Sequence, residues 1–468
     1  MGKALALLLC ALASAAHADG TRTHVHPDGP TETCQLLVPF PIAPPDLDPA
    51  ASTWYRDEDS RDIEALCAID LHAESSTAAT AVGVCPKIHG TMPGLEIYDL
   101  DGTGLSKRQF ESARCKIPGR GHGSRGRPRG AVKLAKYKTA AFISEPESML
   151  LYFHFSRLLG NLAHVQPATW RTLDRARYRR WAADGIARLA KADPKLTTLD
   201  GWQVLDRLLD PRTLPRPRIV HARERLVVDD LLVWGALVEN PRGERERQAL
   251  CLTGGKNLAH PTGWRQYAFY RLVNSRRPLA EQRFTLQQLA CARDYTDMVV
   301  LDTLFNQIDR MGNVHQKTYY HSVDDRGRMT WSSKQTPGAV PLTRLLLKDN
   351  DDGLKWSVRS LIVAFDLLGD IHHMDPTVYA RIQWLAGLMM APASAARIKT
   401  WFTTAVHVRE VNYDHVRDRF VDLAARLQRA HDRGQLLLDL DLAAAVAAAA
   451  TPRPPSAPRS ASAGPPAR

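Results

Sequence analysis

Apolar residues follow two different periods along this chain. Over residues 61–117, 131–138 and 225–240 they form the short runs and alternations that are typical of strands. Further along they recur at the spacing of one helix face. The pattern therefore predicts an α+β protein with a small β-rich first part and a mostly helical second part.

Residues 144–160 carry the clearest helical signal. Ser144 and Glu147 have the spacing of a capping box, in which each side chain bonds the other residue's backbone N–H, and Gly160 suits the end of the helix. Further helices are predicted over residues 170–215, 284–308, 354–368 and 376–428.

Residues 1–18 have the form of a secretory signal peptide. Lys3 gives a basic start, residues 4–13 are apolar, and residues 16–18 (AHA) form a small-x-small cleavage site, so cleavage is expected after Ala18. The apolar run is too short to favour a membrane span, and no later segment reaches 18 apolar residues. The sequence therefore predicts a secreted or periplasmic protein with no transmembrane segment in the mature chain.

The cysteines support export. Removal of the signal peptide takes away one of seven and leaves Cys34, Cys67, Cys85, Cys115, Cys251 and Cys291. An even number in an exported chain favours disulfides, and the lack of CxxC spacing argues against a zinc ribbon. Local bridges are expected among the first four, and the last two are candidates for a bridge in the second half.

The net charge of +12 is compatible with an anionic partner such as ATP, but an arginine-rich composition explains it as well. Residues 118–130 (PGRGHGSRGRPRG) are basic and rich in glycine. Two interpretations of this segment stay open, a loop that covers phosphate and a disordered loop. Because no aromatic residues lie among these arginines, no nucleic acid is expected as a partner.

Two acidic loops are the main candidates for chemistry. Residues 297–315 are an apolar helical run that ends in a polar loop with Asp309 and Asn313, and residues 345–353 (LLLKDNDDG) are an apolar run that ends at Asp349. In phosphoryl transfer one aspartate orients the attacking hydroxyl, while a second aspartate and an amide bind the metal. The pattern favours Asp309 as the catalytic residue, with Asn313 and Asp349 as metal ligands.

The strand over residues 131–138 supplies candidate phosphate ligands. Since side chains alternate across a strand, Lys136 and Lys138 share one face and Lys133 points to the other. Lys136 is the first choice for binding nucleotide and Lys138 the second. A basic edge strand that resists aggregation is the competing interpretation.

These motifs together resemble the secretory-pathway atypical kinases of the Golgi casein kinase and four-jointed group and their uncharacterised bacterial relatives. The resemblance covers about residues 130–430 and rests on a strand lysine, the helix over residues 144–160, Asp309-Arg310 and Asp349-Asn350. It implies a two-lobed, kinase-like fold that uses ATP and Mg²⁺ or Mn²⁺. It also implies transfer of the γ-phosphoryl group to a hydroxyl acceptor, either protein or glycan.

One departure from the family pattern bears on activity. Met149 stands where the family has the glutamate that orients the nucleotide lysine, and Glu145, one turn earlier, is the candidate replacement. The residue after Asp309-Arg310 is Met311, where the family has histidine. A catalytically inactive, pseudokinase-like binding protein is therefore the alternative function.

The expected organisation has five parts. A signal peptide (1–18) precedes a cysteine-containing region (19–117), a kinase-like N-terminal lobe with a helical insertion (118–240) and a helical C-terminal lobe with the acidic loops (241–442). Residues 443–468, rich in proline and alanine, are expected to be a disordered tail. The histidines at positions 24, 26, 372 and 373 have no converging partners in the sequence and are expected to be structural or exposed.

Overall fold

The structure of the protein is a computed structural model that describes most of residues 20–450. The described part excludes residues 1–19, 27–28, 45–53, 74–81, 89–91, 116–130, 142–143, 193–196, 214–221, 243–244, 247–263, 266, 311–313, 326, 328 and 451–468. The predicted signal peptide, the glycine-rich segment 118–130, Cys251 and Asn313 therefore lie outside the described residues.

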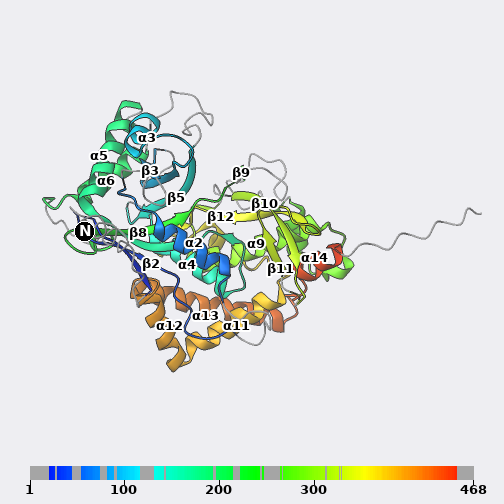
Figure 1. Ribbon diagram of the computed structural model, residues 1–468. Coiled ribbons are helices and arrows are strands. Elements are labelled where there is room, and N and C mark those ends of the chain that lie inside the picture. The colour runs from blue at the N-terminus through cyan, green and yellow to red at the C-terminus, as the bar shows by residue number, and fades with distance from the viewer. Residues whose placement is uncertain are drawn as a thin grey trace, which may run out of the picture.

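A seven-stranded sheet occupies the first half of the chain, with the order β1-β2-β7-β8-β5-β4-β3 (Figure 1). Its strands are β1 (Thr21–His24), β2 (Glu32–Gln35), β3 (Val82–Pro86), β4 (Leu95–Asp99), β5 (Val132–Thr139), β7 (Ala168–Asp174) and β8 (Leu232–Glu239). The strand predicted over residues 131–138 is confirmed as β5. Strands from the two predicted regions 19–117 and 118–240 join in this one sheet, since β4 pairs with β5.

Helices accompany this sheet. They are α2 (Asp57–Ala68), α3 (Lys107–Arg114), α5 (Arg175–Ala192) and α6 (Thr197–Leu209). The predicted helical segment 170–215 is confirmed by α5 and α6, although its first residues belong to β7. The prediction that residues 61–117 are β-rich is wrong in part, because α2 and α3 carry much of that region.

A smaller sheet has the order β11-β10-β12-β6, with β9 paired to β10, and all its strands except β6 come from the second half of the chain. Its strands are β6 (His164–Val165), β9 (Arg245–Glu246), β10 (Val314–Val323), β11 (Met329–Ser332) and β12 (Val340–Leu347). The helices of this half are α8 (Ala268–Val273), α9 (Leu286–Phe305), α10 (Leu361–Ala364), α11 (Pro376–Met390), α12 (Pro392–Thr404), α13 (Glu410–Asp432) and α14 (Leu442–Ala450), with single turns η2 (Leu279–Glu281) and η4 (Asn350–Asp352). The predicted α+β class, β-rich first and helical afterwards, is confirmed.

Two predictions of local structure are corrected in this half. The helix expected over residues 354–368 is reduced to the single turn of α10, because Ser360 caps it and its chain bends at Asp366, where φ is positive. Residues 443–450 belong to α14 rather than to a disordered tail. Leu442 and Val446 are buried in α14, and this burial stabilises an alanine-rich helix that composition alone would leave unfolded.

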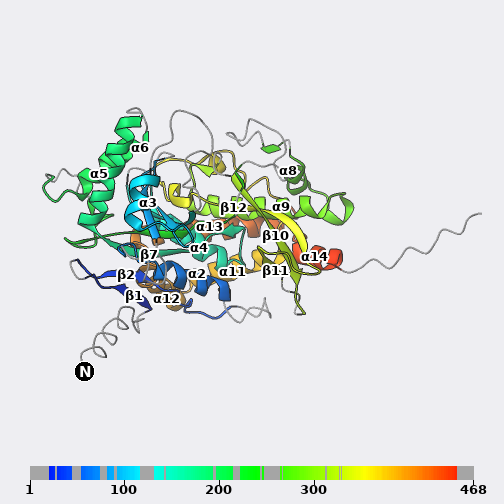
Figure 2. The ribbon, with the colours of Figure 1, turned by 45° about the horizontal axis from the view of Figure 1, so that its top comes forward.

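Helix α4 (Pro146–Leu158) lies between the two halves (Figures 1 and 2). All thirteen of its residues are buried, and it packs against β7, β8, α9 and η4. Pro146 occupies the first turn, where a missing N–H costs nothing. A helix buried on every side fixes how the larger sheet meets α9, so α4 sets the relation between the two acidic loops and β5.

The capping box predicted for α4 is wrong. The N-cap is Glu145, and its side chain makes no capping hydrogen bond. Ser144 instead donates to Asp351 at 2.8 Å, and Glu147 binds Arg409 and Asn412 of the C-terminal helices. Both side chains therefore bind residues that are distant in the chain. For Glu147 this is favourable because a buried carboxylate gains more from a guanidinium than from a backbone N–H.

Two disulfides confirm the prediction of local bridges near the N-terminus. Cys34 is bonded to Cys67 and Cys85 to Cys115. Cys291 is also disulfide-bonded. These bridges are compatible with an exported protein. Within the described residues, no helix is both long and apolar enough to cross a membrane.

A buried ion pair joins α2 to α4. Arg157 donates to both carboxylate oxygens of Asp59, at 2.9 and 3.0 Å, and to the carbonyl oxygen of Val165 at 3.0 Å. Asp59 is fully buried and Arg157 is 2% exposed. Burial would raise the pKa of Asp59, but Arg157 and Arg56 outweigh it and hold that pKa far below its usual range.

We predict that Asp59→Ala lowers the free energy of unfolding by about 3–5 kcal/mol, because it leaves Arg157 buried without its partner. Urea unfolding of the disulfide-intact protein at neutral pH measures this loss. Glu58→Ala is the matched control: it breaks the exposed Glu58–Arg61 pair of the same helix. That control should cost less than about 1 kcal/mol. Equal losses in the two variants would contradict the assigned role of the buried pair.

Candidate functional site

The candidate site forms where β5 meets the loop after β12. Lys136 Nζ lies 3.4 Å from Asp349 Oδ1, and Lys138 Nζ lies 2.8 Å from Asp351 Oδ2. Lys136 and Lys138 are two residues apart on one strand, so both point to the same face, as the alternation predicted. The expectation that Lys133 points to the other face is wrong, because an irregularity in the pairing with β4 at Leu134 turns it to the face of Lys136, where it pairs with Glu96 of β4 at 3.1 Å. Two cations from one half of the molecule therefore face two carboxylates from the other.

Arg310 holds the acidic loop in position. It donates to both oxygens of Asp302 in α9, at 2.9 and 3.1 Å, to the carbonyl oxygen of Lys348 at 2.8 Å and to Asn350 Oδ1 at 2.6 Å. The guanidinium is almost fully buried and thereby ties the end of α9 to the loop that follows β12. Arg310 acts as a positioning residue within the protein, rather than as a ligand for phosphate.

The backbone of the loop turns sharply at Asp349, whose φ is +50°. This left-handed conformation is uncommon for residues other than glycine, although aspartate and asparagine tolerate it best. It directs the Asp349 carboxylate towards Lys136 while Asp351 and Asp352 enter the single turn η4. Asp349 is the more accessible of the lysine-bound pair, with 26% of its side chain exposed against 2% for Asp351.

Electrostatics separate the three aspartates of the loop. Burial would raise the pKa of Asp349 and of Asp351, but Lys136 and Lys138 outweigh it at Asp349, Lys138 and Lys87 outweigh it at Asp351, and both pKa values lie below the usual range. Asp352 behaves in the opposite way. Burial and the Asp351 charge raise its pKa to about 7, and Asp309 adds to the effect.

A third lysine, Lys87, belongs to this cluster. It follows β3, and burial together with the charges of Lys138 and Lys136 lowers its pKa to about 7. Sequence reasoning missed Lys87, because this residue lies well before β5 in the chain and is brought to the site only by the pairing of β3, β4 and β5. Asp351 and Asp352 could have been found from the sequence, as an acidic run next to Asp349.

The two glutamates near the start of α4 contact arginines. Glu145 pairs with Arg225 and lies 3.3 Å from Arg409, while Glu147 pairs with Arg409. Glu145 is predicted to orient the nucleotide lysine, but in the structure it contacts arginines. Lys136 is paired with Asp349 instead. Met149 is buried in α4, as its apolar side chain requires.

Asp309 lies on the turn that follows α9 and is exposed. Its backbone N–H donates to the side chain of Gln307 at 3.1 Å, and its carboxylate is close enough to Asp352 to raise the pKa of that group. The structure thus gathers Lys136, Lys138 and Asp349 and puts Asp309 at the rim.

The residues present fit a divalent cation with phosphate groups. Hard cations take carboxylate oxygens, and the loop offers Asp349 and Asp352. The Oδ1 atom of Asp352 is buried and has no hydrogen-bond partner among the described residues, which is unusual unless a ligand completes the site. The three lysines provide the positive charge that phosphate oxygens require.

We predict that Asp352→Asn stabilises the protein increasingly as pH rises. In the folded state Asp352 holds its proton up to a pKa of about 7, whereas its ordinary pKa is 3.8. Between these values the folded state binds more protons than the unfolded state, so the wild type loses stability as pH rises. Asparagine lacks this loss. Unfolding by urea, measured without divalent cations from pH 4 to pH 8, tests the slope.

Asp325→Asn is the matched control, since it removes one negative charge at an exposed turn. Its difference from the wild type should stay nearly constant over the same range. A constant difference for Asp352→Asn as well would show that this carboxyl group is not held protonated.

Comparison with known proteins shows a distant likeness in structure and none in sequence. No protein family and no curated protein matches the sequence. Among solved structures, the chain is similar to the Golgi casein kinase, with a TM-score of 0.37 and 10% sequence identity over 84% of this chain and 84% of that chain. A likeness at this level assigns no function to this chain.

Proposed function

We propose that this protein is an exported atypical kinase, which transfers the γ-phosphoryl group of ATP to a hydroxyl group of a protein or glycan with the help of Mg²⁺ or Mn²⁺. The single observation that carries the proposal is the meeting of Lys136 and Lys138 with Asp349 and Asp351 across the two halves of the molecule. Paired cations for phosphate beside carboxylates for metal are what phosphoryl transfer requires.

The lysines and the acidic loop divide the work of binding. Lys136 is 14% exposed and holds Asp349 at 3.4 Å, a loose contact that phosphate oxygens can replace. Lys138 is 2% exposed and holds Asp351 at 2.8 Å, so it keeps the acidic loop in place. Lys136 is therefore the phosphate ligand and Lys138 the positioning residue. Asp349 and Asp352 hold the cation, which neutralises charge on the phosphates when bound.

Asp309 is the residue that handles the acceptor. It is exposed at the rim of the site and its charge reaches Asp352. In the reaction the acceptor oxygen forms a bond to the γ-phosphorus while the bond to the bridging oxygen of ADP breaks. The hydroxyl proton passes to the Asp309 carboxylate, which also orients the hydroxyl for attack. Asn313, predicted as an auxiliary metal ligand, lies outside the described residues and keeps that role as a proposal.

Export follows from the predicted signal peptide, and the two local disulfides support it. Asp309 is exposed and therefore accessible to a hydroxyl of a protein or glycan, and the choice between them depends on loops around the site.

A second candidate function is a non-catalytic, pseudokinase-like binding protein. The contacts of Glu145 and Glu147 with Arg225 and Arg409 favour it, because no glutamate of α4 is then left to orient Lys136. In that case the lysines and the acidic loop would bind a nucleotide and cation without transfer.

We predict that the purified mature protein transfers label from γ-labelled ATP to itself or to hydroxyl acceptors in the presence of Mg²⁺ or Mn²⁺. Asp309→Ala should lower the rate by about 10²–10⁴-fold, the size of a general acid–base contribution, while nucleotide binding persists. Asp349→Ala and Lys136→Ala should weaken both transfer and cation-dependent nucleotide binding. Initial rates and equilibrium binding of a fluorescent ATP analogue measure the two effects.

Lys133→Ala and Asp325→Ala are the matched controls. Lys133 lies on the same strand as Lys136 but pairs with Glu96 of β4 rather than with the acidic loop, and Asp325 is an exposed aspartate away from the acidic loop. Both should keep wild-type rates. If the wild type binds nucleotide without transferring phosphate, the result supports a non-catalytic binding protein. If the wild type shows no binding and no transfer, both proposed functions are wrong.

A further inference from the structure

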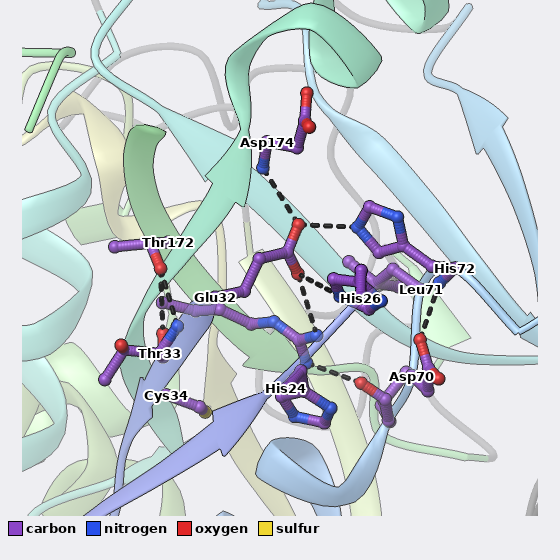
Figure 3. A network of polar contacts seen from close by, with 12 residues as sticks. His24, His26, Glu32, Thr33, Cys34, Asp70, Leu71, His72, Thr172 and Asp174 are labelled. Atoms are coloured by element: carbon purple, nitrogen blue, oxygen red, sulfur yellow. Dashed lines mark hydrogen bonds and ion pairs between the residues drawn. The ribbon is translucent and has the colours of Figure 1, made fainter. Parts of the chain in front are cut away.

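A second polar cluster lies on the first strands of the chain, among His26, Glu32 and His72 (Figure 3). His26 follows β1, Glu32 opens β2, and His72 follows the end of α2. The Cys34–Cys67 disulfide links β2 to α2 and so brings the second and third of these segments together. The expectation that His26 lacks converging partners is therefore wrong, because those partners come from other segments.

The three side chains present their donor atoms to one another. His72 Nε2 lies 2.5 Å from Glu32 Oε1, and His26 Nε2 lies 3.8 Å from Glu32 Oε2. The two imidazole rings stack with their centroids 3.8 Å apart. One nitrogen of each histidine and one carboxylate oxygen all lie within 4.8 Å of one another. Donor atoms at this spacing surround a space that a small cation can occupy.

Two of these donor atoms are buried without a hydrogen bond. Glu32 Oε1 accepts from the backbone N–H of Asp174 at 2.8 Å as well as from His72. Glu32 Oε2 and His26 Nε2, by contrast, have no hydrogen-bond partner among the described residues, although Glu32 is fully buried. A buried carboxylate oxygen with no hydrogen bond is costly, even with the Arg171 guanidinium 3.5 Å away, and a ligand bound between these atoms would remove that cost.

His24, two residues before His26, does not join the cluster. Its Nε2 atom lies 2.7 Å from the carbonyl oxygen of Cys67, and it is buried. Its expected structural role fits this contact. The difference between the two histidines shows that the cluster is selective rather than a general gathering of imidazoles.

Two arginines also face the cluster. Arg171 Nη2 lies 3.5 Å from Glu32 Oε2, and Arg177 donates to His72 Nδ1 at 2.7 Å. Arg171 balances the charge of Glu32 while no cation is bound. Because Arg177 bonds Nδ1, the proton of the neutral His72 ring lies on Nε2. For Nε2 to bind a cation the ring proton must shift from Nε2 to Nδ1, which can then no longer accept from Arg177, so Arg177 must move away from the ring.

We propose that His26, Glu32 and His72 form a binding site for a divalent first-row transition cation such as Zn²⁺. Two histidine nitrogens and one carboxylate oxygen are a common set of zinc ligands. Three protein ligands leave a fourth position for water. Hard cations such as Mg²⁺ prefer oxygen ligands, so this site differs in chemistry from the acidic loop. The proposal is independent of the kinase function.

The test is Zn²⁺ binding to the purified mature protein, measured by competition with a chromogenic chelator in excess Mg²⁺, which occupies oxygen-ligand sites. The wild type should bind Zn²⁺, and its thermal midpoint should rise with Zn²⁺ because only the folded state has the site. His26→Gln and His72→Gln should each weaken binding by at least about tenfold, a change that even outer-shell substitutions reach.

His415→Gln, at an exposed position of α13, is the matched control and should bind as the wild type does. Asp349→Ala should also keep the Zn²⁺ affinity, which separates this test from that of phosphoryl transfer. His26 is partly exposed, so its variant tests the proposal even if substitution at the buried Glu32 prevents folding. Equal Zn²⁺ affinity in the wild type, His26→Gln and His72→Gln would overturn the proposal.

Discussion

The buried ion pair between Lys138 and Asp351 is the contact on which the arrangement of the candidate site depends. Both side chains are 2% exposed, and the pair joins a strand of the larger sheet to the loop after β12. Neither charge can be buried alone, because an isolated buried ion costs several kcal/mol. The two halves of the molecule must therefore meet at this point, and Lys136 and Asp349 are brought together as a consequence.

The positions around that pair are fixed by groups that do not themselves take part in chemistry. Helix α4 is buried along its whole length and separates the sheet from α9, while Arg310 ties α9 to the acidic loop. Arg157 and Asp59 fix α4 from the other side. Buried arginines with bidentate partners recur at each junction, which suits a rigid site because the planar guanidinium loses little freedom per bond.

The two polar clusters differ in which buried polar atoms are left without a hydrogen-bond partner. At the acidic loop Lys136 and Lys138 each pair with a carboxylate, and Asp352 has a buried Oδ1 atom that finds no hydrogen-bond partner among the described residues. Near the N-terminus the leftover groups are Glu32 Oε2 and His26 Nε2. An oxygen-rich remainder suits a hard cation, whereas mixed nitrogen and oxygen donors suit a transition metal.

The sequence by itself determined the elements whose cause is local. Alternation placed Lys136 and Lys138 on one face of β5, helical periodicity located α4 and α9, and turn chemistry put Asp309 and Asp349 at the ends of buried elements. It could not assign the partners of Glu145 and Glu147, the place of Lys87, or the meeting of His26, Glu32 and His72. Those depend on pairing between segments that are far apart in the chain, and a buried charge is satisfied by whichever opposite charge the fold brings nearest. The tertiary structure alone decided which polar residues would share a site.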